Sequence, residues 1–227
     1  MARIHFQLQL AELKEKLLAM AKLAQRALET SVEAYLERDE ALAREVDKLE
    51  TAINTSERQV YEMAYELLAK EQPMAIDLRF IFSVIKINAD LERVGDQSIN
   101  ISERVAMLKE YPKLDLPDDG DRIHKMGEHA GRMIAISIQA LLEADAHLAE
   151  TILTMDDEID AMNMDAQASL MKVMEDDPST TIQALNAVIV ARNLERAADH
   201  ATNIAEDVIF WVRGSDVRHR LSLADAD

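Results

Sequence analysis

One acidic pattern occurs twice in this chain, and this repeat limits what the chain can fold into. The pattern Leu-Glu-Arg-x-x-Asp-x-x-x-Asn-Ile-x-Glu begins at Leu91 and again at Leu194, 103 residues later. The spacing is constant across all seven matching positions, so two copies of one folding unit explain it better than chance does. The sequence therefore predicts two tandem units of about 110 residues each.

Each copy of the pattern places oxygen-bearing side chains along one face of a helix. At about 100° per residue, the four positions of a copy fall within about 80° of one another. They are Glu92, Asp96, Asn100 and Glu103 in the first copy, and Glu195, Asp199, Asn203 and Glu206 in the second. A half-buried carboxylate needs a partner, because burial otherwise favours its protonated form. That partner is either a metal ion or a basic side chain in an internal salt-bridge network.

A helical wheel of the first copy separates three faces. Glu92 shares its face with aliphatic residues such as Ile81, Ile85 and Ile99. The opposite side is apolar throughout: Leu91, Val94, Ile101 and Val105. A third set lies roughly 130° from Glu92 and is expected to face water: Lys86, Asp90, Arg93, Gln97 and Arg104. The acidic stripe is therefore not the ordinary solvent-exposed side of a surface helix.

Composition indicates an all-α protein with long helices. Hydrophobic residues make up 48% of the chain, with only five glycines and four prolines to interrupt helices. Aromatic residues make up only 4%, which argues against a β-sandwich or barrel. The formal net charge of −18 argues against a nucleic-acid partner and favours cations or basic partner surfaces.

Targeting signals are not evident in the sequence. It has no cysteine, which excludes thiolate metal sites and fits a cytoplasmic protein. The first residues have no apolar signal-peptide core, and no run of 18 apolar residues predicts a membrane span. We therefore expect no direct insertion into a membrane.

Helical periodicity predicts six helices in two three-helix bundles. Their expected ranges are about 5–38, 40–70, 73–109, 122–143, 146–174 and 178–213. Asp39 is a plausible N-cap, Pro73 suits a first turn, and Gly214 is expected to end the last helix. A segment marked by proline and glycine, 111–120, separates the repeats. The predicted domains are 1–111 and 118–214, followed by a polar tail, 215–227.

The middle helix of each predicted bundle supplies a second set of oxygen ligands. Glu50 and Asn54 in the first repeat correspond to Asp156 and Asp160 in the second, each pair one helical turn apart. Antiparallel neighbours in a bundle can bring such a pair against the stripe of the last helix. Oxygen ligands without cysteine or histidine suit hard cations: iron, manganese, magnesium or calcium, with zinc also compatible. Glu-x-x-His is absent, which argues against oxygen-activating di-iron chemistry.

Other chemistry-bearing residues give weaker signals. The chain has no phosphate-binding glycine loop, no His-Glu-x-x-His and no Gly-x-Ser-x-Gly. His200 is expected at the surface rather than as a ligand, and Trp211 as a packing anchor. Methionines such as Met162, Met164, Met171 and Met174 are expected to fill the core, although adaptable partner surfaces also use methionine.

At these motifs the chain resembles the PhoU family of phosphate-transport regulatory proteins, over almost its whole length. The resemblance includes the doubled Leu-Glu-Arg-x-x-Asp and Asn203-Ile204-Ala205-Glu206. It also includes Gln72-Pro73-x-Ala75-x-Asp77-Leu78-Arg79 and the segment from Val212 to His219. The family's fold is a tandem pair of three-helix bundles, and its acidic motifs can bind iron or zinc. The resemblance also implies a homodimer.

The resemblance implies a function that no residue indicates by itself. It implies a cytoplasmic negative regulator of the phosphate-starvation response, held at the inner membrane through partners. Those partners would be the ATPase of the Pst phosphate importer and a PhoR-type sensor kinase. A runner-up is a metal-dependent phosphoester hydrolase, and a third interpretation is a structural dimerising module. We expect the non-enzymatic adaptor.

Carried onto this sequence, the family's metal motifs match Glu50, Asn54, Glu92 and Asp96 in the first repeat. In the second they match Asp156, Asp160, Glu195 and Asp199. Further ligands could come from Asn100, Glu103, Asn203 and Glu206. Asn54 stands where the family pattern has aspartate and lowers the negative charge of the first site. The second site is therefore expected to bind metal more tightly.

Overall fold

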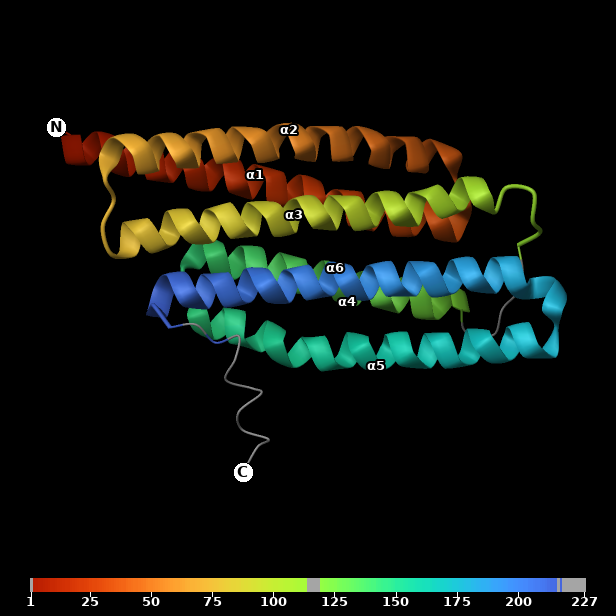
Figure 1. Cartoon of the computed structure of the whole chain (residues 1–227). Helices are drawn as coiled ribbons and strands as arrows, with labels where there is room; N and C mark the ends of the chain where they lie inside the picture. Colours follow the sequence, from red (N-terminus) through yellow and green to blue (C-terminus); the bar gives the residue numbers. More distant parts are fainter. Residues whose placement is uncertain (1, 114–118, 216, 218–227) are drawn as a thin grey trace, which may run out of the picture.

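Six long helices form two bundles of three, as predicted from the sequence (Figure 1). The computed structural model describes residues 2–113, 119–215 and 217. The first bundle contains α1 (Ala2–Glu37), α2 (Glu40–Glu71) and α3 (Ile76–Met107). The second contains α4 (Asp119–Glu143), α5 (Ala146–Asp176) and α6 (Thr181–Arg213), and the 3-10 turn η1 (Pro178–Thr180) precedes α6. The all-α tandem-bundle prediction is confirmed.

The two repeats use the same tight turn between their first two helices. Arg38 and Ala144 adopt left-handed conformations, with φ of 58° and 54°, and thereby end α1 and α4. The next residue, Asp39 or Asp145, caps the following helix by accepting hydrogen bonds from two backbone N–H groups. Asp39 is thus the N-cap that the sequence predicts. A turn this short keeps the paired helices antiparallel and adjacent.

The third helix of the first bundle begins later than the sequence suggests. Gln72 ends α2 in a left-handed conformation, and Ala75 has φ 51°, so Pro73 lies in the connection instead of the first turn of α3. Gly214 ends α6 with φ 73°, as predicted. Residues 114–118 of the predicted linker, and residues 216 and 218–227 of the predicted tail, lie outside the described residues.

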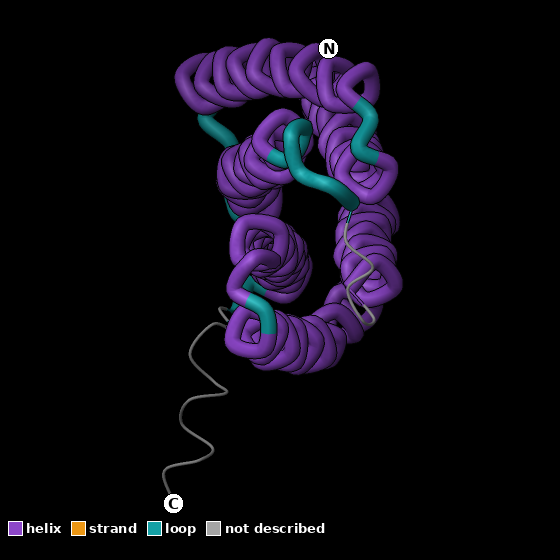
Figure 2. The backbone as a smooth tube through the Cα atoms, turned by 90° about the vertical axis from the view of Figure 1, so that its right-hand side faces the viewer, coloured by secondary structure: helices purple, strands orange, loops and turns teal. Residues whose placement is uncertain are grey.

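One large hydrophobic core runs through both bundles, beside a smaller cluster between α5 and α6. Leu13 and Leu17 of α1, Leu91 of α3, Met133 of α4 and Leu194 of α6 are all fully buried in the large core. On the α1–α4 side, a Cβ added at Gly127 would lie 3.0 Å from Val32 side-chain atoms, so glycine permits this close approach. The bundles are therefore packed on one another, the first above the second in Figures 1 and 2.

The bundles also meet along a polar seam between α3 and α6. Ser83 Oγ donates to the Asp207 carbonyl over 2.9 Å, and Lys86 Nζ donates to Asp207 Oδ1 over 3.0 Å. Seven residues along each helix from the Ser83–Asp207 contact, His200 Nδ1 lies 2.9 Å from Asp90 Oδ1. These contacts make α3 and α6 antiparallel neighbours.

The seam corrects the prediction of which α3 face meets water. Gln97 is 6% exposed, and the side chains of Asp90 and Arg104 are 16% and 13% exposed. Lys86 is partly exposed but forms an ion pair with α6. Arg93 is exposed, as predicted for the water-facing set. His200, expected at the surface, is 13% exposed in its pair with Asp90. A polar face was mistaken for a solvent face because it packs on the other repeat.

Trp211 anchors one end of the seam, as predicted for a packing residue. Its ring lies 4.9 Å from the ring of Phe80, centroid to centroid, and Lys14 Nζ lies 5.6 Å from its ring centroid. Arg79 Nε donates to the Trp211 carbonyl over 3.2 Å. The guanidinium lies against Gly214, where a Cβ would come within 3.2 Å of it. These contacts join the beginning of α3 to the end of α6.

The methionine prediction holds only in part. Met162 and Met174 of α5 are partly buried against the core, whereas Met164 and Met171 are 66% and 57% exposed. The outward side of α5 therefore carries apolar side chains in water.

We expect the ion pair of the seam to couple more strongly than a surface pair. Asp207 is 2% exposed, so a double-mutant cycle with Lys86→Gln and Asp207→Asn should give a coupling free energy of about 1–2 kcal/mol. The control is Lys70–Glu66 of α2, whose side chains are 65% and 66% exposed, with an expected coupling below about 0.5 kcal/mol. Urea unfolding of the four variants of each pair measures both values, and equal couplings would contradict the expectation.

Candidate metal centre

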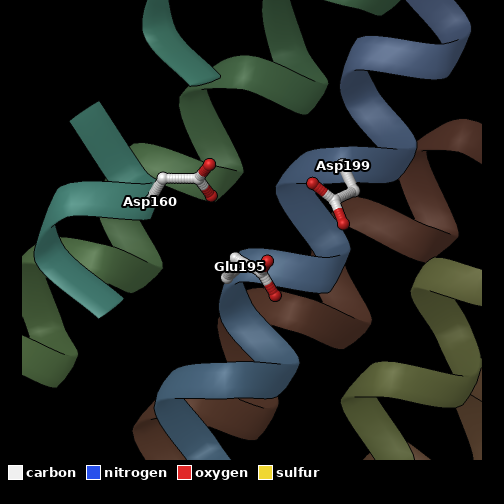
Figure 3. A group of neighbouring side chains, drawn as sticks. All are labelled: Asp160, Glu195 and Asp199. Carbon is white, nitrogen blue, oxygen red and sulfur yellow. The ribbon is translucent and has the colours of Figure 1, made fainter. Parts of the chain in front are cut away.

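Three carboxylates converge between α5 and α6 in the second repeat. Asp160 comes from α5, and Glu195 and Asp199 come from successive turns of α6, with their carboxyl groups turned into the space between the helices (Figure 3). One oxygen from each lies within 4.8 Å of the other two. The wheel argument predicted this arrangement, because positions four apart on a helix share a face.

The fourth predicted ligand of this site, Asp156, is held one turn away on α5. Its Oδ1 accepts a hydrogen bond from Thr202 Oγ over 3.1 Å, which fixes the carboxylate against α6. Burial raises the pKa of Asp156, while the Thr202 hydrogen bond lowers it and the neighbouring Asp160 raises it. Thr202 is a functional neighbour that the sequence analysis did not single out.

Burial and mutual repulsion raise the pKa values of the acids on α6. For Glu195 the cause is burial first, then the charges of Asp199 and Asp160. For Asp199 it is burial, followed by the charges of Asp156 and Asp160. In the described part of the chain, no ion pair joins any of these acids to a lysine or arginine within 4.0 Å. The salt-bridge interpretation of the stripe therefore lacks its basic partners here.

This donor set fits a hard cation. A cluster of carboxylate oxygens from two facing helices, with Asp160 exposed to water, is the kind of site that iron, manganese, magnesium or zinc can occupy. A bound ion would replace the protons that the raised pKa values favour and would remove the repulsion. The assignment of a metal to these residues stays a prediction.

The first repeat holds its acids more loosely. Glu50 and Asn54 lie on α2, and Glu92 and Asp96 on α3. Among the described residues these carboxylates do not form a second three-membered group with oxygens within 4.8 Å. The Asn54 amide instead donates a hydrogen bond to the Glu50 carboxylate. This hydrogen bond stabilises the Glu50 carboxylate, as a bound ion would do more strongly.

Glu57 completes the acidic surroundings of the first repeat. Burial raises the pKa of Glu92, followed by the charges of Asp96, Glu57 and Glu50. Glu57 stands two turns after Glu50 on α2, and its carbonyl accepts from Asn88 Nδ2 over 3.1 Å. The first site therefore has charge repulsion similar to that of the second, without the same convergence of oxygens.

The additional ligands suggested by the sequence have other contacts. Asn203 Nδ2 donates to Asp90 Oδ1 over 3.2 Å, which directs its amide towards the seam. Glu103 pairs with Arg104 over 3.0 Å, and Asn100 is exposed. Glu206 is partly buried and has interactions of its own. The convergent set is the three acids above, with Asp156 adjacent.

The raised pKa values give the acids a destabilising effect that we expect to be measurable. Groups that bind protons more tightly in the folded chain oppose folding once ionised, so stability falls as the pH rises through their raised pKa values. This cost is fully present once the pH is above those raised pKa values. Asp199→Asn should therefore raise the melting temperature of chelator-treated protein at pH 7, by about 2–4 °C for each kcal/mol relieved.

Asp165→Asn is the matched control for that change. Asp165 is exposed on α5 and lies outside the convergent group, so its substitution should leave the melting temperature nearly unchanged. Scanning calorimetry from pH 4 to 8 should show the gain of Asp199→Asn growing with pH. A loss of stability in the absence of metal would contradict the electrostatic account.

Comparison with known proteins agrees with this architecture. A family model described as PhoU domain matches residues 17–105 and 123–208, one copy for each bundle. The chain is 35% identical over 214 residues to the phosphate-specific transport system accessory protein PhoU homolog of Pseudomonas aeruginosa, covering 94% of this chain and 88% of that protein. The homolog with the same description from Aquifex aeolicus is 35% identical, covering 93% and 95%.

Solved structures show the same fold. The crystal structure of PhoU from Pseudomonas aeruginosa superposes with a TM-score of 0.89 at 34% identity, covering 92% of this chain and 100% of that one. The phosphate transport system regulatory protein PhoU from Streptococcus pneumoniae gives a TM-score of 0.85 at 27% identity, covering 93% and 99%. Sequence and fold agree over both repeats, and this chain belongs to the PhoU family.

Proposed function

We propose that this chain is an accessory regulator of a phosphate-specific transport system. It keeps the phosphate-starvation response switched off while phosphate is plentiful, as an adaptor between the importer's ATPase and a PhoR-type sensor kinase. The observation that carries this proposal is the family match over both bundles, with relatives of nearly equal length named as accessory proteins of that transport system. An adaptor needs no catalytic group of its own.

The charge of the chain supports a role in binding basic protein surfaces. A net charge of −18 attracts positively charged partners over long range and makes their association sensitive to salt. None of the described helices is long and apolar enough to cross a membrane. In this proposal the chain stays in the cytoplasm and reaches the inner membrane through its protein partners.

Metal binding is the second part of the proposal. Asp160, Glu195 and Asp199, with Asp156 beside them, would hold an iron or zinc ion, or manganese or magnesium, and Glu50, Glu92 and Asp96 would form a weaker site. A bound ion would tie α5 to α6 and neutralise acids that now repel one another. It would thereby stabilise the folded chain by mass action.

Paired substitutions at equivalent positions test the two metal sites. Asp199→Ala should lower the metal content of anaerobically purified protein several-fold, and Asp96→Ala should lower it less, because among the described residues the three convergent carboxylates belong to the second repeat. Asn54→Asp should raise metal content at the first site by restoring a charged oxygen ligand. Elemental analysis measures all three variants. Equal losses at the two sites, or no metal in the unsubstituted protein, would contradict the ranking.

We also propose that the protein is a homodimer. Light scattering at micromolar concentration should give about twice the mass of one 25.5 kDa chain. A strict monomer under those conditions would remove this part of the proposal.

Deletion of the gene is the test of the regulatory role. Loss of a negative regulator should switch on phosphate-starvation genes in phosphate-rich medium, measured with an alkaline phosphatase reporter. Glu92→Gln and Glu195→Gln, each supplied on a plasmid, then show whether the acidic clusters contribute to repression. Normal repression in the deletion strain would refute the adaptor. Phosphoester turnover by the metal-loaded protein would then favour the hydrolase instead.

A further inference from the structure

A groove of about 710 Å³ runs between α1 and α4, two helices that contribute no residue to either acidic cluster. In Figure 1 these helices lie behind α3 and α6. Both helices line the groove with residues spaced four, three and four apart: positions 25, 29, 32 and 36 of α1, and positions 124, 128, 131 and 135 of α4. From residue 25 to residue 37 the groove follows α1 for about 18 Å, or about three turns. Such spacing on two adjacent helices is the pattern into which a third helix packs.

The groove opens where α1 and α4 move apart. At Gly127 the two helices touch, since a Cβ there would lie 3.0 Å from side-chain atoms of Val32. One turn further along α4, a Cβ at Gly131 would meet no atom from outside its own helix within 4 Å. Gly131 is nevertheless buried, so this space lies at the bottom of the groove and not on the open surface.

Packing within the chain explains Gly127 but not Gly131. Glycine inside a helix is less stable than alanine, and at Gly131 an alanine methyl group would meet no obstacle. A glycine at such a position lets the backbone of another molecule approach the helix closely. The missing side chain is therefore what a closely packed helix from another molecule requires.

The rims of the groove are acidic. Glu29, Glu33 and Glu37 come from successive turns of α1, Glu128 comes from α4, and all four side chains are exposed. Within the described part of the chain, neither Glu33 nor Glu37 forms an ion pair or a side-chain hydrogen bond. The lining also contains one arginine and one histidine, so acidic groups prevail. A partner that covers these glutamates must supply positive charge, because a carboxylate covered without a partner is unfavourable.

We propose that the α1–α4 groove binds one helix of a partner protein, which turns small apolar residues towards Gly131 and lysine or arginine side chains towards the glutamates. The helical form follows from the spacing of the lining residues, and the small residues follow from the space at Gly131. The positive charge follows from the acidic rims. This surface goes beyond the proposed function, because it requires neither a bound metal nor a role in phosphate signalling.

Charge argues against a second copy of this chain as the occupant. Each copy carries a net charge of −18, so the two chains repel one another over long range. Two such grooves facing each other would also bring their glutamates together, and like charges across an interface are unfavourable.

Two alanine substitutions separate the roles of the glycines. Gly131→Ala should raise the melting temperature of the full chain by about 2–4 °C, because helix propensity improves and nothing is displaced. Gly127→Ala should lower the melting temperature, because the new methyl group would press on Val32. A lower melting temperature for Gly131→Ala would show that this glycine serves the fold itself, and would overturn the proposal.

A synthetic peptide tests the binding. The probe is a fluorescein-labelled peptide of three heptads, with alanine at position a, leucine at position d and lysine elsewhere, added to the full chain at physiological ionic strength. We expect saturable binding in fluorescence anisotropy and a gain of peptide helicity in circular dichroism. Gly131→Leu fills the bottom of the groove and should weaken binding about tenfold. Replacing both Glu33 and Glu37 by glutamine should weaken binding about threefold or more.

Two controls make the test specific. Glu62→Gln together with Glu66→Gln makes the same charge change at the same spacing, in a smaller acidic groove of about 370 Å³ between α1 and α2. This control should leave binding unchanged. A second peptide, with two residues of its central heptad replaced by proline, cannot form the continuous helix and should bind about tenfold more weakly.

Three results would overturn the helix site. They are equal binding of the proline peptide, binding that Gly131→Leu leaves unchanged, and no binding to the unsubstituted chain. Loss of self-association in Gly131→Leu, measured by light scattering, would make a second copy the occupant and would overturn the proposal as well. Repression of phosphate-starvation genes is a separate measurement, so failure of the regulatory role and failure of the groove remain distinguishable.

Discussion

The polar contact between α3 and α6 determines how the two halves of this protein are arranged. Lys86–Asp207 and Asp90–His200 join the repeats at specific heights, and Asp207, Asp90 and His200 are largely buried in these contacts. An apolar seam would tolerate sliding, whereas hydrogen-bonded pairs favour one register. With the register set, the α2–α3 and α5–α6 acidic clusters have fixed positions relative to each other.

The acidic clusters show how duplication can produce related sites with different properties. In the second repeat, Asp160 completes a three-carboxylate group with Glu195 and Asp199. In the first, the Asn54 amide donates a hydrogen bond to the Glu50 carboxylate, and the acids repel one another without forming such a group among the described residues. The pKa values of carboxylates in both repeats are raised, so bringing these charges together on folding costs free energy. Retaining such a cost in both copies is reasonable for a site that binds a cation.

Local signals made much of this structure predictable from the sequence. Asp39 caps a helix because its side chain accepts hydrogen bonds from adjacent backbone N–H groups. Gly214 ends a helix because a residue without a side chain adopts a positive φ without strain. The stripe containing Glu195 and Asp199 follows from helical geometry alone. The seam could not be predicted in this way, because a wheel of one helix does not show what packs against its polar face. Gln97 and Asp90 therefore seemed solvent-facing, and the partner of Asp90 is 110 residues away at His200.

The residues that form the seam differ between the two repeats, and this difference limits how two chains can associate at high protein concentration. If the first repeats of two chains paired with each other, Lys86 would face Arg104, the residue that corresponds to Asp207. If two second repeats paired, Asp207 would face Ile189, the counterpart of Lys86. The first exchange opposes two cations, and the second leaves a buried carboxylate against an aliphatic chain. Only the pairing of unlike repeats satisfies these groups, so the seam disfavours association of two chains through two like repeats.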